Sequence, residues 1–490
     1  MAKLIIQVPN LLWWLAAVYA IVVAMFMVLE NNNPEKSIAW IACFLLFPVF
    51  GVVIYFMFGR DYRAFSRHDK LLRQELGSNL NTNPYVADFL AQQAAELKHL
   101  REVGPLLYHR ALELMRRNAQ GRLFAYNTLE ILQNGVEKYA RLLADLKAAQ
   151  HSIHMEYFEW SSDDFMQEVK QILLERAKAG VEVRVVYDPW GCLLMLNWRY
   201  VREMNAGGVK MLPWSRLYAI HTISYRSHRK IAVIDGKIGY TGGLNMSEEY
   251  LNGPKDGHFT GWRDTHVRVT GQVVLGLQVS FAVQWYNTTQ EQLTDLAYYP
   301  APAEKADYLP IQIVNSGPDA EWKAIRELYF ALITGAHKHI YIQSPFFILD
   351  QGLAEAIAGA ARSGVDVKVM LAPSGPGPKF PYRAGFTYAE NMAKAGVKIY
   401  FYQGAYFHPK TLCIDSVLCS IGSANMDIRS FSINYELNLI IYDEKTTLEL
   451  EADFANDLQQ CVPFNVKRYE HGNVAQRTLD SLCRLLSPVL

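Results

Sequence analysis

The sequence shows no excess of charge of either sign and contains little cysteine. Its 490 residues carry 48 Lys and Arg against 48 Asp and Glu, so the formal net charge at pH 7 is zero. A balanced charge gives no electrostatic footprint for a nucleic acid, so no nucleic-acid partner is expected. The six cysteines have no metal-binding or redox spacing. We therefore expect reduced, buried thiols in a cytosolic compartment.

Charge is also absent from two long apolar runs near the amino terminus, residues 11–29 and 38–58. Each run has about the 20 residues that a helix needs to cross a bilayer. The polar segment between them, residues 30–36, is long enough for a tight hairpin. The first run lacks a small-x-small cleavage site and a second run follows at once, which argues against a cleaved signal peptide. We therefore predict a two-span transmembrane hairpin over residues 1–60.

Basic residues follow the second run and predict how the hairpin is oriented. By the positive-inside rule, they place both ends of the hairpin and the rest of the chain in the cytoplasm. The same cluster would attract anionic membrane lipids by about 1 kcal/mol per cation, although an ordinary topology signal also explains it. Residues 61–120 are rich in helix formers, and we expect a helical juxtamembrane connector that lies along the membrane or packs on the first half of the remaining chain. The basic residues are Arg60, Arg63, Arg67, Lys70 and Arg73.

One pattern occurs twice in the remaining chain, with its copies 180 residues apart. Each copy reads His-x-Lys-x4-Asp and continues into a glycine-containing segment that ends in Asn. A single His-x-Lys is uninformative, but two matched copies with the same continuation form an internal repeat. The first copy contains His228, Lys230, Asp235, Gly242, Gly243 and Asn245, and the second contains His408, Lys410, Asp415, Gly422, Ser423 and Asn425.

Both copies lead into a β-branched, apolar stretch that ends in a turn, which is typical of a buried strand. Side chains two residues apart on a strand point to the same face, so the His and Lys of each motif should project together. Two repeats packed about a pseudo-two-fold axis would therefore bring two imidazoles and two ammonium groups to one site.

This set of groups suits chemistry at a phosphate. One neutral imidazole can attack phosphorus, and a second, protonated imidazole can donate a proton to the leaving oxygen. Lys230 and Lys410, with the amides of Asn245 and Asn425, would hold the non-bridging oxygens as negative charge develops there. We expect no metal and no cofactor, because cations and amide donors already face the phosphate.

Some of these residues have a structural alternative. An Asp before Gly or Ser at the end of a strand forms turns in its own right, so Asp235 and Asp415 could support the fold instead of acting with the catalytic set. Asn245 and Asn425 could cap helices, although we favour contact with the phosphate.

The motifs resemble those of the phospholipase D superfamily, in which two His-x-Lys-x4-Asp motifs form one active site. The resemblance covers residues 120–490. It implies an α/β fold in which two pseudo-symmetric halves, residues 121–305 and 306–490, share one active site and follow the two transmembrane helices. Strand and helix patterns alternate in each half, as expected for a sheet covered by helices.

The same resemblance implies a set of supporting residues. The acidic position that orients a catalytic histidine in this superfamily matches Glu436, and its counterpart in the first half is Asp264. Near the start of the halves Glu156 aligns with Gln343, so the second half lacks this charge and Gln343 is not expected to do acid–base work. The supporting set is Asp264, Glu436, Glu156, Gln343, Gly243 and Ser423.

Two apolar spans, two intact motifs and the sequence of residues 484–490 together resemble the bacterial cardiolipin synthases of this superfamily. The resemblance implies that histidine attacks one phosphatidylglycerol, that glycerol leaves, and that a second phosphatidylglycerol takes the phosphatidyl group to give cardiolipin. We expect His228 as the nucleophile and His408 as the acid and base, with the exchanged roles left open. The expected location is the bacterial inner (cytoplasmic) membrane, with a multi-pass topology and the catalytic halves facing the cytoplasm; a homo-oligomer stays open.

Other functions share these motifs. A phospholipase D-type hydrolase, or a synthase that uses phosphatidylethanolamine as donor, would need the same residues. A nuclease fits the motifs, but the apolar spans and the balanced charge argue against it. A membrane scaffold that keeps only the fold would have no need of His, Lys and Asn in both halves.

Overall fold

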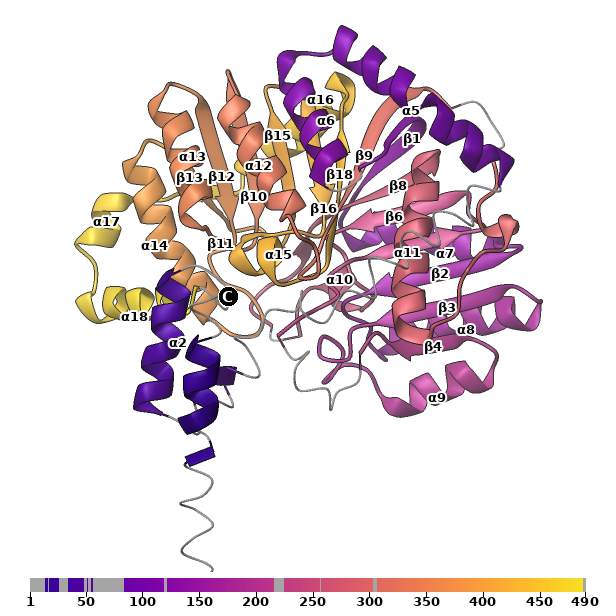
Figure 1. Ribbon diagram of the computed structural model, residues 1–490, viewed down its shortest axis with the longest axis horizontal. Helices are drawn as coiled ribbons and strands as arrows, with labels where there is room; N and C mark the ends of the chain where they lie inside the picture. The colour runs from indigo at the N-terminus through magenta and orange to yellow at the C-terminus, as the bar shows by residue number, and fades with distance from the viewer. Residues whose placement is uncertain are drawn as a thin grey trace, which may run out of the picture.

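The computed structural model describes residues 14–15, 17–25, 34–47, 51, 54–55, 83–118, 121–215, 224–255, 257–302 and 306–487. A single 15-stranded sheet runs through both halves of the chain, and helices cover its two faces (Figure 1). The strand order is β19-β13-β12-β10-β15-β16-β18-β9-β1-β8-β6-β5-β2-β3-β4. This arrangement confirms the α/β class that the alternating pattern predicts.

The first half contributes the sheet from β1 to β4 and its helices. Its elements are β1 (Leu123–Gln133), α7 (Asn134–Ala148), β2 (Ser152–Tyr157), α8 (Asp164–Lys178), β3 (Glu182–Tyr187), α9 (Trp198–Ala206), β4 (Lys210–Pro213), β5 (Ile231–Ile234), β6 (Ile238–Gly242), α10 (Glu249–Asn252), β7 (Trp262–Arg263), β8 (Thr265–Gly271), α11 (Val273–Thr289) and η3 (Leu296–Tyr298).

The second half repeats this succession and adds a short carboxyl-terminal part. Its elements are β9 (Tyr308–Ser316), α12 (Ala324–Gly335), β10 (His339–Ser344), β11 (Phe347–Ile348), α13 (Gln351–Arg362), β12 (Asp366–Leu371), α14 (Phe380–Lys394), β13 (Lys398–Tyr402), β14 (Tyr406–Phe407), β15 (Thr411–Ile414), β16 (Leu418–Gly422), β17 (Met426–Asp427), α15 (Ile428–Ser432), β18 (Glu436–Ile441), α16 (Glu444–Leu458), β19 (Cys461–Pro463), α17 (Val466–Glu470) and α18 (Val474–Arg484).

The two halves join at the centre of the sheet, where β1 and β9 pair in antiparallel register. From this seam outward, β8, β6, β5, β2, β3 and β4 on one side match β18, β16, β15, β10, β12 and β13 on the other. Strands β2, β3 and β4 run parallel to one another, as do β10, β12 and β13, and the inner strands are antiparallel. The pseudo-two-fold relation therefore extends to every strand of the sheet except β19, which pairs antiparallel with β13 at the edge of the second half.

The motif strands are buried on both faces. In β5, Ile231 and Val233 belong to one apolar cluster of the core, while Ala232 and Ile234 belong to another. All four are at most 1% exposed. Side chains alternate between the faces of a strand, and helices cover both faces here, so each position must be apolar. This burial explains the continuous apolar run after each His-x-Lys.

Two helices precede the first half, α5 (Pro84–Val103) and α6 (Leu106–Asn118). In α5, Phe89 stacks on Phe124 of β1 with ring centroids 5.2 Å apart. In α6, Tyr108 donates a hydrogen bond of 2.5 Å to the carbonyl of Val417 in the second half. The fully buried Leu112 joins the core that contains α12. The described helices of the connector thus pack on the second half as well as on the first.

The predicted transmembrane spans, residues 11–29 and 38–58, lie in part outside the described residues, as does much of the connector. Helix α2 (Pro34–Leu46) falls in this region, and its Phe44 packs edge-on against Tyr55 with ring centroids 5.3 Å apart. Within the part of the chain that the structure describes, no helix has the length and apolar character needed to cross a membrane.

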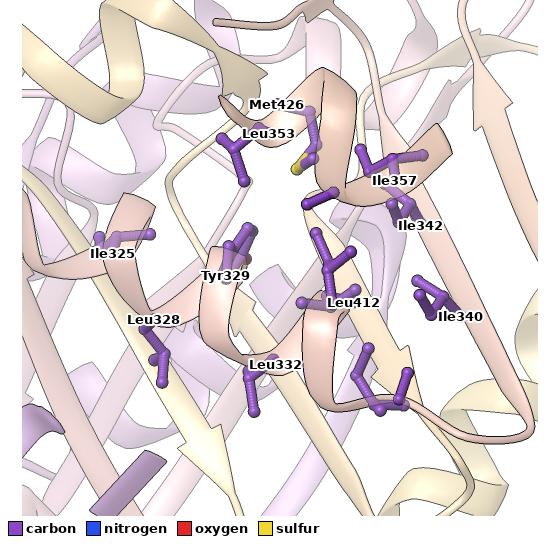
Figure 2. Packing of buried hydrophobic residues seen from close by; sticks show 14 of the residues in the cluster. Ile325, Leu328, Tyr329, Leu332, Ile340, Ile342, Leu353, Ile357, Leu412 and Met426 are labelled. Carbon is purple, nitrogen blue, oxygen red and sulfur yellow. The ribbon is translucent and has the colours of Figure 1, made fainter. Parts of the chain in front are cut away.

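The core of the second half is built around α12 (Figure 2). Its apolar face meets β10 and β15 below and α13 to one side, so side chains far apart in sequence interdigitate. The labelled residues Ile325, Leu328, Tyr329, Leu332, Ile340, Ile342, Leu353, Ile357, Leu412 and Met426 are all at most 2% exposed.

We predict that Leu332→Ala lowers the free energy of unfolding by about 2–5 kcal/mol, because it leaves a cavity between α12 and the sheet. Leu448→Ala on α16 is the matched control, since Leu448 is 47% exposed and surface truncations stay within about 0.5 kcal/mol. Denaturant unfolding in detergent, followed by tryptophan fluorescence, measures both. Equal midpoints for the two variants would contradict the packing described for α12.

Candidate active site

The two motifs meet at one edge of the sheet. Strand β5 runs antiparallel to β2, with Ile231 opposite Glu156, so the residues that precede β5 lie at the carboxyl end of β2. Strand β15 stands in the same relation to β10, with Thr411 opposite Gln343. Carboxyl ends of parallel strands are where α/β folds place their ligands. His228, Lys230, His408 and Lys410 all occupy this edge.

Each motif is held in place by the other half of the chain. The backbone N–H of His228 donates to the carbonyl of Tyr435 (2.9 Å), and that of His408 donates to the carbonyl of Arg263 (2.8 Å). Tyr435 and Arg263 each stand one residue before an acidic residue, Glu436 or Asp264. The crossing backbone bonds therefore bring each carboxylate to the histidine of the opposite half.

The histidine side chains complete this exchange. Nδ1 of His228 lies 3.0 Å from both carboxylate oxygens of Glu436, and Nδ1 of His408 lies 2.7 Å from Oδ2 of Asp264. A carboxylate only accepts, so Nδ1 donates in each pair and the lone pair resides on Nε2. Both imidazoles are 8% exposed and both carboxylates are fully buried. Neither motif histidine is paired with a carboxylate of its own half.

Burial and the neighbouring charges set the protonation of these pairs. Burial lowers the pKa of His228, and burial with the charge of Lys410 lowers the pKa of His408 to about 3. Burial alone would raise the pKa of Asp264 and of Glu436, but the cationic groups beside them hold both values below the usual range. The free site therefore contains two neutral imidazoles, each backed by a carboxylate anion.

The motif lysines lie beside the histidines. Nζ of Lys230 donates to the carbonyl of His228 (2.6 Å), and Nζ of Lys410 donates to that of His408 (2.5 Å). Burial lowers the pKa of Lys230 to about 7 and that of Lys410 to about 8, although Glu436 and Asp264 oppose the shift. An anion that binds beside them would therefore raise both pKa values and favour the ammonium form of both lysines.

The glycine segments support the carboxylates in two different ways. Ser423 donates its hydroxyl to Oε2 of Glu436. At the repeat-related position, a Cβ on Gly243 would stand 2.0 Å from Oδ1 of Asp264, so this position has no room for a side chain. In the second half a hydroxyl group therefore holds the Glu436 carboxylate, and in the first half the missing side chain leaves space for the Asp264 carboxylate.

The two asparagines lie at the site but differ in their partners. Nδ2 of Asn245 donates to Oε2 of Glu159 (2.9 Å) and to the hydroxyl of Tyr250 (2.6 Å). Oδ1 of Asn425 is buried and, among the described residues, has no hydrogen-bond partner. Neither asparagine is an N-cap, because the N-cap residue of α10 is Glu248 and that of α15 is Asp427. The helix-capping alternative is therefore wrong.

Asp235 and Asp415 do not reach the histidines. Each follows its motif strand at the opposite end, roughly 20 Å along the chain direction. Asp235 accepts backbone N–H bonds from residues 150–152, and Asp415 accepts them from residues 337–339. Their φ angles are 53° and 55°, a left-handed turn conformation that Asp tolerates. This placement fits the supporting role and does not fit a direct part in the chemistry.

Glu156 lies on β2 and Gln343 on β10, the strands that pair with the motif strands β5 and β15. Glu156 accepts a hydrogen bond of 2.5 Å from the hydroxyl of Ser227, and burial raises its pKa. Gln343 accepts from the hydroxyl of Thr411 (2.9 Å) and donates to Asp457 (2.8 Å). Both side chains bond to residues on the motif segments or beside them, as supporting residues should.

Sequence reasoning missed two charged residues in this region. Lys138 of α7 is fully buried, and its Nζ donates to the carbonyl of Asn245 (2.8 Å), so it holds the asparagine segment from below. Glu159 binds the side chains of Asn245 and Tyr250. Glu159 follows the end of β2, a position that could have pointed to the site. Lys138 lies on an amphipathic helix, where a lysine ordinarily indicates the exposed face.

Comparison with known proteins agrees with this geometry. A family model described as "Cardiolipin synthase, PLD-like domain" matches residues 142–256 and 329–458, and one described as "Phospholipase D-nuclease N-terminal" matches residues 12–60. A cardiolipin synthase from Geobacillus thermodenitrificans is 36% identical over 474 residues, covering 96% of this chain and 91% of the relative. Cardiolipin synthase 2 from Bacillus anthracis is 37% identical over 482 residues, covering 96% and 90%. Phosphatidylserine synthase from Haemophilus influenzae is similar in fold, with a TM-score of 0.59 at 15% identity over 78% of this chain and 99% of that structure.

We predict that Gly243→Ala reduces turnover of a phosphodiester substrate by about 100-fold, because the added methyl displaces Asp264 from His408 and small misplacements have effects of that size. Ser423→Gly is the matched variant in the other half. It removes one hydrogen bond to Glu436 without a clash, and a loss of less than about 10-fold is expected. Similar losses in the two variants would mean that the contact at Gly243 does not position Asp264.

Proposed function

Because the chain belongs to the cardiolipin synthase family of phospholipase D-like enzymes, it is an enzyme of cardiolipin synthesis, and we propose that it joins two phosphatidylglycerol molecules through a phosphatidyl-histidine. The observation that carries this proposal is the pair of imidazoles, each oriented by a carboxylate of the opposite half and flanked by a lysine. The products would be cardiolipin and glycerol.

In the first step, Nε2 of His228 attacks the phosphorus of one phosphatidylglycerol and forms a P–N bond. The P–O bond to glycerol breaks, and His408, as its imidazolium, donates a proton to the departing oxygen. The phosphodiester anion raises the pKa of the imidazole beside the leaving oxygen, so His408 takes up the required proton from solvent when the donor lipid binds. Glu436 stabilises the positive charge that develops on His228, and Asp264 does so for His408.

In the second step, a hydroxyl of another phosphatidylglycerol takes the place of glycerol. His408, now neutral, removes the hydroxyl proton while the oxygen attacks phosphorus and the P–N bond breaks. The products are cardiolipin and the enzyme with His408 protonated; when cardiolipin leaves, this proton returns to solvent, so atoms and protons balance over the cycle. The near-symmetry of the site makes the exchanged roles of His228 and His408 the direct alternative, and trapping the labelled intermediate distinguishes them.

The lysines and asparagines would bind the non-bridging oxygens in both steps. Lys230 and Lys410 become more firmly cationic when a phosphodiester arrives, because the anion opposes the effect of burial on their pKa values. A buried site without bulk water makes this attraction stronger and shields the phosphatidyl-histidine from hydrolysis. Asn245 and Asn425 would contribute amide donors from both sides after a side-chain rearrangement, because Asn245 donates to Glu159 and Tyr250 in the free site.

We further propose that residues 11–29 and 38–58 form a transmembrane hairpin that holds the catalytic halves at the cytoplasmic face of a bacterial inner membrane. The match of residues 12–60 to an amino-terminal family model and the bacterial origin of the relatives support this location. An enzyme fixed at the bilayer meets both lipids at high local concentration.

Purified protein in phosphatidylglycerol liposomes should release glycerol and form cardiolipin in equal amounts. His228→Ala and His408→Ala should each reduce this turnover by about 100-fold or more, as expected for loss of a nucleophile or a proton donor. With 32P-labelled donor, label should remain covalently bound to His408→Ala and not to His228→Ala; the opposite result would exchange the two roles. Phosphatidic acid in place of cardiolipin would identify a hydrolase, and cardiolipin only with added phosphatidylethanolamine would identify a different donor.

The lysine environment predicts the alkaline pH dependence. Lys230 and Lys410 have pKa values of about 7 and about 8 in the free protein and bind phosphate only as cations. We therefore expect kcat/KM, which reports the free enzyme, to fall as the pH rises through this range. The bound phosphodiester raises both pKa values, so the fall in kcat should occur at higher pH. Alkaline limbs at the same pH for both parameters would contradict this assignment.

A further inference from the structure

We propose that Arg226 and Arg429 form a second phosphodiester-binding subsite, which holds the phosphate of the acceptor lipid. This inference rests on the proposed function, in which both substrates are phosphatidylglycerol. Such a subsite would favour an anionic lipid alcohol over a neutral alcohol as acceptor.

The acceptor lipid carries a second negative charge, and the motif residues provide no further cation to bind it. Glycerol, the leaving group, is neutral, but the acceptor that replaces it carries a phosphodiester one glycerol unit from the attacking hydroxyl. Lys230 and Lys410 are already engaged by the phosphorus that is transferred. An anion that enters a partly buried site without a cation loses hydration and gains nothing in return.

Arg226 lies on the motif segment itself. The Tyr435 N–H donates to the carbonyl of Arg226 (2.8 Å) and the His228 N–H donates to that of Tyr435 (2.9 Å), so the chain is extended here. Side chains two residues apart then share one face. Arg226, His228 and Lys230 therefore follow one another along the site, with Arg226 as the outermost cation.

Arg429 comes from the other half and reaches the same place. It stands four residues after Asn425, and its Nη2 donates to the carbonyl of Ser224, two residues before Arg226. Burial lowers the pKa of both guanidinium groups, that of Arg226 to about 10. Arginine side chains keep their charge at neutral pH in proteins. Planar guanidinium groups match the geometry of phosphate oxygens.

Two carboxylates lie near these arginines, and each of them also accepts other hydrogen bonds. Asp188 accepts from the indole N–H of Trp214 (2.7 Å) and from the backbone N–H groups of residues 190, 191 and 227. Asp427 accepts from the Ser430 N–H (2.6 Å). Among the described residues, Arg226 forms no ion pair; it donates to the Tyr225 carbonyl (2.8 Å), and its guanidinium lies 5.6 Å from the Trp190 ring centroid.

The repeat-related positions show that this feature belongs to one side only. Tyr406 takes the place of Arg226 and bonds through its hydroxyl to Tyr382 (2.8 Å). Glu249 takes the place of Arg429, and Glu159 also lies on that side, bonded to Asn245. At these repeat-related positions one side of the site therefore carries two cations, with Asp188 and Asp427 near them, and the other carries a carboxylate and a tyrosine. A second phosphodiester is attracted to the first and repelled from the second.

The test compares two acceptors with one donor. Labelled glycerol exchanges into phosphatidylglycerol by reversal of the first step, and this exchange involves one phosphate, whereas cardiolipin synthesis involves two. In Arg226→Gln and Arg429→Gln, cardiolipin synthesis should fall at least about 10-fold more than glycerol exchange, as expected for loss of a charged hydrogen bond to a buried anion. Arg226→Lys, which keeps the charge but not the planar fork, should lie between wild type and Arg226→Gln.

Three results would contradict either the arginine subsite or the proposed function. Equal losses in synthesis and exchange would show that the arginines only position His228, and unchanged synthesis would remove the subsite. Wild-type protein that makes neither cardiolipin nor exchanged phosphatidylglycerol would instead refute the proposed function. Arg199→Gln is the control, because Arg199 is 72% exposed on α9 and should leave both rates unchanged. Circular dichroism confirms that each variant is folded.

Discussion

The crossed histidine–carboxylate pairs are the constraint on which the rest of the structure depends. Glu436 can reach His228, and Asp264 can reach His408, only if the halves are fixed at one relative position. The antiparallel seam between β1 and β9 and the backbone bonds at Tyr435 and Arg263 provide that position. A fully buried carboxylate without its cationic partners would be very unfavourable. Docking of the halves and assembly of the site are therefore the same event.

The first and last residues of the repeat motif have different roles at the two ends of one strand. Its first residues, His and Lys, face the site, and its last residue, Asp, ends the strand and collects three backbone N–H groups from the start of the neighbouring strand. Asp235 thereby fixes β2 against β5, and Asp415 fixes β10 against β15. The spacing of four residues between Lys and Asp equals the length of the buried strand. The constant spacing thus reflects the width of the sheet as well as the chemistry.

Much of this arrangement could be predicted from the sequence. The repeat identified His228, Lys230, His408 and Lys410, and the period-two pattern placed each pair on one face. The division of the acids between halves could not be predicted, because it depends on pairings between residues more than 140 positions apart. The partners of Asn245, Glu159 and Tyr250, were also missed, because the motif spacing does not show these side-chain contacts. Lys138 was missed because of its residue type: its spacing from Leu142 and Leu146 places it on the buried face of α7, but a lysine is ordinarily exposed, and only tertiary contacts show the carbonyl group that it binds.

Where the two halves differ is as informative as where they match. A symmetric site would bind two equivalent ligands, but the proposed reaction needs a donor that is attacked and an acceptor that attacks. In the proposed reaction, the identical histidine and lysine positions would serve the shared phosphorus, which would lie near the pseudo-two-fold axis and contact both halves alike. Arg226 corresponds in the repeat to Tyr406, and Arg429 corresponds to Glu249. These positions lie away from that axis, where the two ligands must differ. Divergence of the copies there gives the reaction a direction without disturbing the chemistry at its centre.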